Sequence, residues 1–100
     1  MKHAGQQEIT NVVVEAGEQV SPDARQYAHD RIAPLARFAP EPTTYAHVRI
    51  VNAGARTVKV HANLDVNGTP VVAQAEADTV TEAIDAVRDH LHRQLVKMHN

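Results

Sequence analysis

The sequence contains no cysteine among its 100 residues. It therefore has neither a disulfide framework nor a thiolate metal site, which suits a cytoplasmic protein. It also has no uninterrupted apolar run of 18 residues, and its first eight residues lack the apolar core of a secretory signal. We therefore expect a cytoplasmic protein that does not interact with membranes.

Residues that carry catalysis are scarce as well. Ser21 is the only serine, and it precedes Pro22 and Asp23, an arrangement typical of a helix N-terminus rather than of a nucleophile. No glycine-rich phosphate loop is present. Among the seven histidines, His90 and His92 point about 200° apart on a helix, so they lack the i, i+4 spacing of a helical zinc site. We expect no enzyme, no metal, no cofactor and no small-molecule substrate.

Large apolar side chains are few, because 16 alanines and 14 valines make up most of the hydrophobic content of 43%. A chain of this length forms one domain with a modest core. We place that single domain at residues 8–98.

The spacing of apolar residues predicts six elements. Alternation with a period of two indicates half-buried strands, and steps of three and four indicate helices with one apolar face. The predicted order is strand 9–16, helix 22–38, strand 43–51, strand 56–66, strand 71–77 and helix 80–98.

Local signals support these bounds. Pro34 removes a backbone donor, so we expect a kink or a loosened last turn in the first helix. Asn67-Gly68 favours a tight hairpin turn. Thr79 and Glu82 form the pattern of a capping box at the start of the second helix. We expect these side chains to face the core from the second strand and the second helix: Thr44, Ala46, Val48, Ile50, Val80, Ile84, Val87, Leu91, Leu95 and Met98.

The predicted fold class is α+β, in the order β-α-β-β-β-α. A sheet with one apolar face needs both helices on that face, giving a four-stranded mixed sheet with two helices packed on one side. A right-handed crossover makes the first two strands parallel, and the last three strands form an antiparallel meander.

The formal charge of −2 is unevenly distributed. Residues 21–38 carry +1 and residues 88–100 carry +2, which leaves −5 for the remainder. On a helical wheel, His90, Arg93 and Lys97 cluster on the side opposite Leu91. A solvated helix explains this pattern, and so does a surface that binds a phosphate backbone.

The pattern of the second half resembles the ribosome hibernation promoting factor family, also called ribosome-associated inhibitor A or sigma modulation protein. The resemblance covers residues 9–98 in one β-α-β-β-β-α register. It is carried by the segments ANLDVNG at 62–68, AQAE at 73–76, EAIDAV at 82–87 and DHLHRQLVK at 89–97, together with RQYA at 25–28 in the first helix.

This resemblance implies a stress or stationary-phase protein that binds the small ribosomal subunit at the mRNA/tRNA channel, inhibits translation and protects idle ribosomes. It implies contacts between ribosomal RNA and basic side chains of the two helices. His90 and His99 stand where lysine is usual in the family, which suggests binding that strengthens at acid pH. The implied rRNA-binding residues are Arg25, Arg31, Arg37, His90, Arg93, Lys97 and His99.

The sequence leaves one alternative open. The same fold can serve as a protein-interaction or dimerisation module that has lost strong rRNA binding, and self-association is compatible with either reading. The polar face of the sheet would then make the contact, through His47, Arg49, Lys59, His61 and Gln74.

Overall fold

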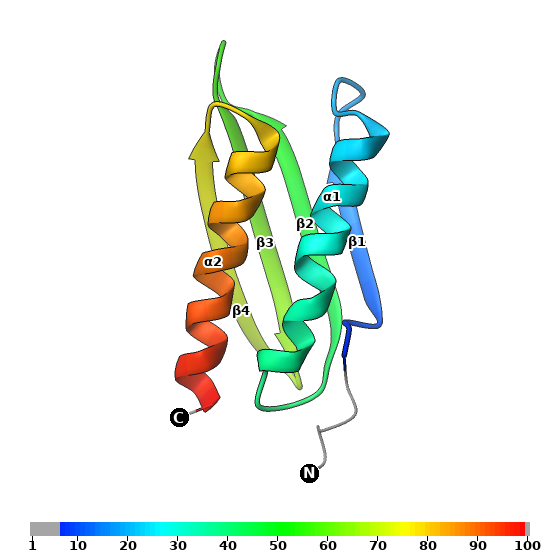
Figure 1. The fold of residues 1–100 in the computed structure, drawn as a ribbon, viewed down its shortest axis with the longest axis vertical. Coiled ribbons are helices and arrows are strands. Elements are labelled where there is room, and N and C mark those ends of the chain that lie inside the picture. The colour runs from blue at the N-terminus through cyan, green and yellow to red at the C-terminus, as the bar shows by residue number, and fades with distance from the viewer. Residues whose placement is uncertain (1–6, 100) are drawn as a thin grey trace.

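The computed structural model describes residues 7–99. Four strands form one sheet in the order β1-β2-β3-β4, and two helices lie against it (Figure 1). The elements are β1 Asn11–Ala16, α1 Pro22–Ile32, the 3₁₀ helix η1 Ala33–Phe38, β2 Thr43–Asn52, β3 Val58–Val66, β4 Thr69–Ala77 and α2 Val80–His99.

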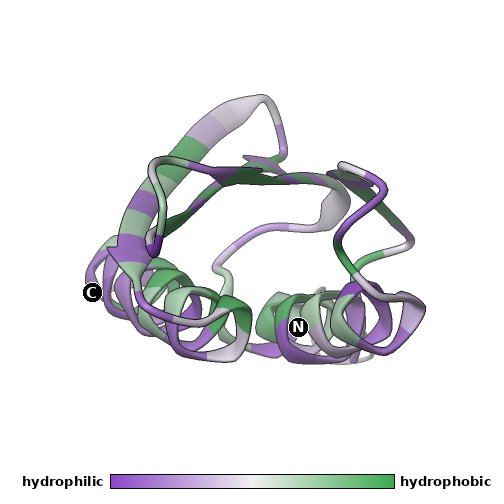
Figure 2. Ribbon diagram, turned by 90° about the horizontal axis from the view of Figure 1, so that it is seen from above, coloured by the Kyte–Doolittle hydropathy of each residue, from purple (hydrophilic) through white to green (hydrophobic). Residues whose placement is uncertain are grey.

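The predicted topology is confirmed. β1 pairs with β2 in parallel, while β2–β3 and β3–β4 are antiparallel. Both helices lie on the same side of the sheet, which leaves the other side uncovered by either helix (Figure 2). No helix within residues 7–99 is both long and apolar enough to cross a lipid bilayer.

The first helix changes character at the predicted proline. The α-helix ends at Ile32, and residues 33–38 continue as a 3₁₀ helix with Pro34 in its first turn. The prediction of one helix running to Phe38 is therefore wrong in its second half, because Pro34 has no amide hydrogen for an α-helical bond. The expected loosening at Pro34 is confirmed.

The predicted helix caps at Ser21 and Thr79 and the predicted turn at Asn67-Gly68 are confirmed, and of the predicted capping box the structure shows the bond that Thr79 accepts. The Ser21 Oγ accepts a hydrogen bond of 3.1 Å from the Ala24 amide, and Thr79 Oγ1 accepts one of 3.2 Å from the Glu82 amide. In the turn between β3 and β4, Asn67 has φ 51° and Gly68 φ 92°, so both occupy the region that the turn requires.

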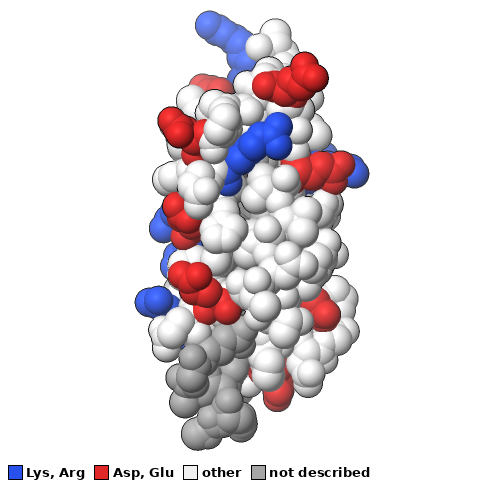
Figure 3. All heavy atoms as spheres, turned by 90° about the vertical axis from the view of Figure 1, so that its right-hand side faces the viewer, with Lys and Arg blue, Asp and Glu red and all other residues white. Residues whose placement is uncertain are grey.

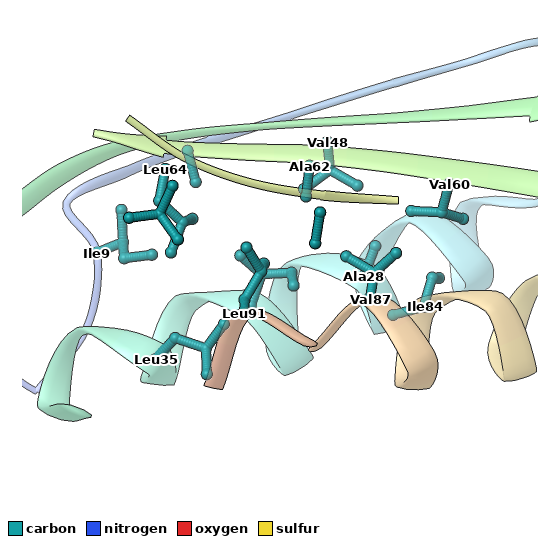
Figure 4. Packing of buried hydrophobic residues seen from close by; sticks show 14 of the residues in the cluster. Ile9, Ala28, Leu35, Val48, Val60, Ala62, Leu64, Ile84, Val87 and Leu91 are labelled. Carbon is teal, nitrogen blue, oxygen red and sulfur yellow. The ribbon is translucent and has the colours of Figure 1, made fainter. Parts of the chain in front are cut away.

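The core lies between the inner face of the sheet and the two helices. Figure 4 shows side chains of the sheet pointing toward side chains of α2, namely Val48, Val60 and Leu64 toward Ile84, Val87 and Leu91. Ala28 of α1 and Leu35 of η1 belong to the same core. These side chains are almost fully buried.

Two predicted inward positions are wrong. The strand register shifts between Thr43 and Tyr45, so Thr43 is buried and the predicted Thr44 is exposed. An extra residue in one strand reverses the side to which the preceding side chains point. Met98 is 37% exposed, because the last turn of α2 extends beyond Leu95, the final α2 residue of the core.

Strand bounds shift by a few residues. β1 begins at Asn11 rather than at residue 9, and β3 begins at Val58 rather than at residue 56, so Arg56 lies exposed in the preceding loop. β4 begins at Thr69, directly after the turn. Ile9 still contributes to the core, and its amide donates a hydrogen bond of 2.9 Å to the Ala33 carbonyl.

Candidate functional site

Three of the seven predicted site residues lie together on α2. His90, Arg93 and Lys97 line one open depression of about 340 Å³, and Gln94 lines it with them. Their spacing of three and four residues places them on one side of the helix, away from the buried Leu91 and Leu95. We call this group the α2 cationic surface: His90, Arg93, Gln94 and Lys97.

Gln94 was missed by the sequence reasoning. Its Nε2 donates a hydrogen bond of 2.8 Å to the Val72 carbonyl on β4, the edge strand of the sheet. This bond ties α2 to the sheet edge and satisfies an edge carbonyl. The sequence signal that could have found Gln94 is its spacing, because a residue four after His90 and three before Lys97 lies on the same side of a helix.

Arg93 and Lys97 of this surface are available to a ligand, and so is Arg37 on η1. Within residues 7–99, no carboxylate forms a salt bridge with Arg37, Arg93 or Lys97. Arg37 lies exposed on η1, and His99 lies exposed in the last turn of α2. An unpaired exposed cation can bind an anion without first breaking an internal ion pair.

Arg31 is engaged between the helices. Its Nε donates a hydrogen bond of 3.1 Å to Asp85 Oδ1 on α2, and the hydroxyl of Tyr27 donates one of 2.6 Å to the same oxygen. The hydrogen bond to Asp85, followed by desolvation, raises the pKa of Tyr27 above its ordinary value of 10.0. This cluster joins α1 to α2, and Arg31 keeps 39% of its side chain exposed.

Arg25 is bound to the main chain. One terminal nitrogen of its guanidinium donates hydrogen bonds of 3.0 Å to the Ala16 carbonyl and 2.9 Å to the Gly17 carbonyl, and Nε donates one of 3.4 Å to the Val20 carbonyl. Arg25 thus holds the loop between β1 and α1, away from the α2 cationic surface.

A second contact packs η1 against α2. The Phe38 ring meets the His92 ring edge-on, with centroids 4.4 Å apart, and the guanidinium carbon of Arg88 lies 5.9 Å from the Phe38 centroid. This geometry combines an aromatic pair with a cation–π contact. Arg88 and His92 therefore stabilise the position of η1, which carries Arg37.

On α1 and on the side of the molecule formed by β1 and α1, acidic side chains lie among the basic ones. On α1, Gln26 donates a hydrogen bond of 2.9 Å to Asp30, and this bond with the neighbouring His29 lowers the pKa of Asp30 below 3.8. On the side of the molecule formed by β1 and α1, Lys and Arg side chains alternate with Asp and Glu around a broad uncharged area (Figure 3). By contrast, Arg93 and Lys97, which form no salt bridge with a described carboxylate, lie in the segment 88–100 that carries +2 in the sequence.

Comparison with known proteins agrees with this fold. Residues 12–100 match the family model described as Sigma 54 modulation protein / S30EA ribosomal protein. A protein of Azotobacter vinelandii named ribosome hibernation promoting factor is 36% identical over 73 residues, which are 73% of this chain and 66% of that protein. The chain thus spans slightly less than two thirds of the length of that relative.

Two solved structures share the fold. The N-terminal domain of Protein Y from Thermus thermophilus has a TM-score of 0.73 and 22% identity, with 91% of this chain and 98% of that chain covered. A ribosomal subunit interface protein from Coxiella burnetii has a TM-score of 0.71 and 22% identity, covering 88% and 96%. At this level of identity the two structures establish the likeness of the fold.

Proposed function

Because this chain belongs to the Sigma 54 modulation protein / S30EA ribosomal protein family, we propose that it is a ribosome hibernation factor of the cytoplasm. In this proposal the domain at residues 8–98 binds the small ribosomal subunit at the mRNA/tRNA channel, inhibits translation and protects idle ribosomes. Stress or the stationary phase is the setting in which such a factor acts.

The α2 cationic surface is the observation that carries the proposal. It places Arg93 and Lys97 beside His90 and Gln94, without a salt bridge to any carboxylate among the described residues. Arginine and lysine bind RNA phosphates, and binding to folded RNA depends on shape and backbone contacts more than on base sequence. A short row of cations on a rigid helix suits such a contact.

The proposed mechanism is steric and involves no catalysis. The two helices and the sheet form one packed body through the core and the Tyr27–Asp85–Arg31 cluster. A rigid domain bound at the mRNA/tRNA channel would occupy the space that mRNA and tRNA need. We assign the holding contacts to Arg31, Arg37, His90, Arg93, Lys97 and His99.

Arg25 has a different part in this proposal. Because its donors bind the carbonyls of Ala16, Gly17 and Val20, its first task is to fix the loop before α1. An rRNA contact by Arg25 stays a prediction from the family resemblance. Its substitution is therefore expected to affect stability before it affects binding.

Competition on purified small subunits tests the proposed location. The chain, carrying a fluorescent label, is bound to small subunits and then challenged with mRNA and initiator tRNA. We expect mRNA and tRNA to displace the chain and the chain to inhibit translation in a cell-free system. Simultaneous binding of all three with unchanged affinities would contradict a site in the channel.

A further inference from the structure

The side of the sheet opposite the helices carries its own cluster of hydrogen-bond donors. Arg49 of β2, Lys59 and His61 of β3, and Gln74 of β4 line an open depression of about 240 Å³ together with Val51. Arg49 is directly opposite His61, and His61 is directly opposite Gln74. Each of the four polar side chains can donate a hydrogen bond, and no carboxylate from the described part of the chain lines the depression.

The acidic residues of this face surround the donors, with Glu15 and Glu76 on the two edge strands and Asp65 at one end of β3. Glu15 on β1 accepts a hydrogen bond of 2.9 Å from His47 and lies 3.8 Å from Arg49. Glu76 on β4 is opposite Lys59, yet Lys59 forms no salt bridge with any described residue. The two middle strands therefore carry a stripe of donors between acidic margins.

We call this stripe the outer stripe and define it by outward-facing residues of β2 and β3: Tyr45, His47, Arg49, Lys59, His61 and Asn63. At about 3.3 Å per residue, the six steps from Tyr45 to Val51 span roughly 20 Å. Asp65, opposite Tyr45, closes one end of the outer stripe, and its carboxylate is engaged by the Gly68 amide at 2.7 Å.

An aromatic ring lies on the same face. Tyr45 is 39% exposed and points outward like Arg49, because alternate residues of β2 share a side. Proteins that bind single-stranded nucleic acid combine a positive track for the backbone with aromatic rings on which bases stack. We therefore choose single-stranded RNA as the occupant, because its bases can stack on the Tyr45 ring while its phosphates meet the donors.

We propose that the outer stripe is a second RNA-binding surface that holds an unpaired RNA strand along β2 and β3. Backbone phosphates lie against Arg49, Lys59 and His61, and a base stacks on Tyr45. The inference adds to the proposed function a contact on the opposite side of the molecule. It uses none of the α2 residues, so each surface can be tested without the other.

A short fluorescent oligouridylate, which has no stable structure, is the probe, and fluorescence anisotropy of the full chain is the measurement. Arg49→Gln and Lys59→Gln are each expected to weaken binding by up to about fivefold, the upper limit for an exposed charge. Arg56→Gln, which removes an exposed loop cation outside the outer stripe, is the matched control and should leave the affinity unchanged. The double variant should lower the salt slope by about 1.4, since each phosphate contact on a single strand contributes about 0.7.

Two further variants test the geometry. Glu15→Gln removes the acid beside Arg49 and should strengthen binding, whereas Tyr45→Ala should weaken it without changing the salt slope. Circular dichroism and thermal unfolding establish that each variant is folded. A fall in affinity for Glu15→Gln, or a full salt slope in the folded Arg49→Gln/Lys59→Gln variant, would overturn the proposal.

The test also separates this surface from the proposed ribosome site. If Arg93→Glu/Lys97→Glu abolishes oligouridylate binding and the outer-stripe variants do not alter it, the inference fails while the proposed function stands. If only the outer-stripe variants alter oligouridylate binding, and Arg93→Glu/Lys97→Glu leaves small-subunit binding unchanged, the inference stands while the assignment of α2 in the proposed function fails. Equal competition by polyglutamate, or a dimer that the Arg49→Gln/Lys59→Gln variant dissociates, would assign the outer stripe to a protein partner and overturn the proposal.

Discussion

The hydroxyl of Tyr27 on α1 donates a hydrogen bond of 2.6 Å to the Asp85 carboxylate on α2, 58 residues away along the chain. Arg31 donates to the same oxygen at 3.1 Å. Asp85 therefore joins the two helices through one oxygen atom that accepts a neutral and a charged donor. The contact links α1, which continues into η1 with Arg37, to α2, which carries the α2 cationic surface.

This contact predicts a loss of stability at alkaline pH. The hydrogen bond to Asp85 and desolvation raise the folded-state pKa of Tyr27 above 10.0, so the folded protein holds this proton more tightly than the unfolded chain does. The stabilisation is complete below pH 10 and decreases as the pH rises through the folded-state pKa. Tyr27→Phe lacks the group, and its deficit in unfolding free energy should shrink above pH 10 in urea titrations. A deficit that does not change with pH would contradict this account.

Arg25 is predicted to act on stability. Arg25→Ala removes three hydrogen bonds to the carbonyls of the loop before α1, and a hydrogen bond with a charged partner contributes about 1.5–3 kcal/mol. We expect a loss of about 2 kcal/mol in unfolding free energy by urea denaturation. Arg56→Ala, which removes an exposed arginine, is the control and should cost less than about 0.5 kcal/mol. Equal losses for both variants would show that the loop does not depend on Arg25.

His90 is predicted to make small-subunit binding depend on pH. It lies in the α2 cationic surface with Arg93 and Lys97, and β4 contributes no charged side chain to that lining. Histidine gains a positive charge within the range of pH 8 to 5, so affinity should rise between pH 7.5 and pH 6. The gain is at most about fivefold for one exposed charge. His90→Gln should flatten the profile, and an unchanged profile in that variant would remove His90 from the contact.

Salt dependence separates the two functions that the sequence leaves open. Contacts by Arg37, Arg93 and Lys97 with three phosphates should give a slope of roughly −2 to −3 in a plot of log affinity for the small subunit against log salt. A protein-interaction module that has lost strong rRNA binding would not bind the small subunit with this slope. Filter binding over a range of potassium chloride concentrations measures the slope.

The sequence predicted the elements whose signals are local. Ser21 and Thr79 cap their helices through side chains three residues from the amide they bind, and Asn67-Gly68 supplies the backbone angles of its own turn. Pro34 ends the α-helix through its missing amide hydrogen. Such effects depend on neighbours in the chain, so the residue pattern is sufficient to predict them.

Features that depend on distant partners were not predictable in the same way. The shift that buries Thr43 arises from the pairing of β2 with β3, which periodicity within β2 does not specify. The bonds of Arg25 require the exact path of the loop before α1, and the bond from Tyr27 to Asp85 requires the packing of two helices. For the candidate site, helical spacing brought His90, Arg93 and Lys97 together correctly, since these residues share one helix.

The most direct test of the central claim is co-sedimentation of Arg93→Glu/Lys97→Glu with purified small ribosomal subunits in sucrose gradients. Both substitutions lie on the exposed side of α2, so the circular dichroism spectrum should match that of the unsubstituted chain. Arg56→Glu, which reverses one exposed charge in the loop before β3, is the control for charge reversal outside α2. We predict that the double variant no longer sediments with small subunits and that the control does so normally. Retained sedimentation of the folded double variant would contradict the assignment of α2 as the ribosome-binding surface.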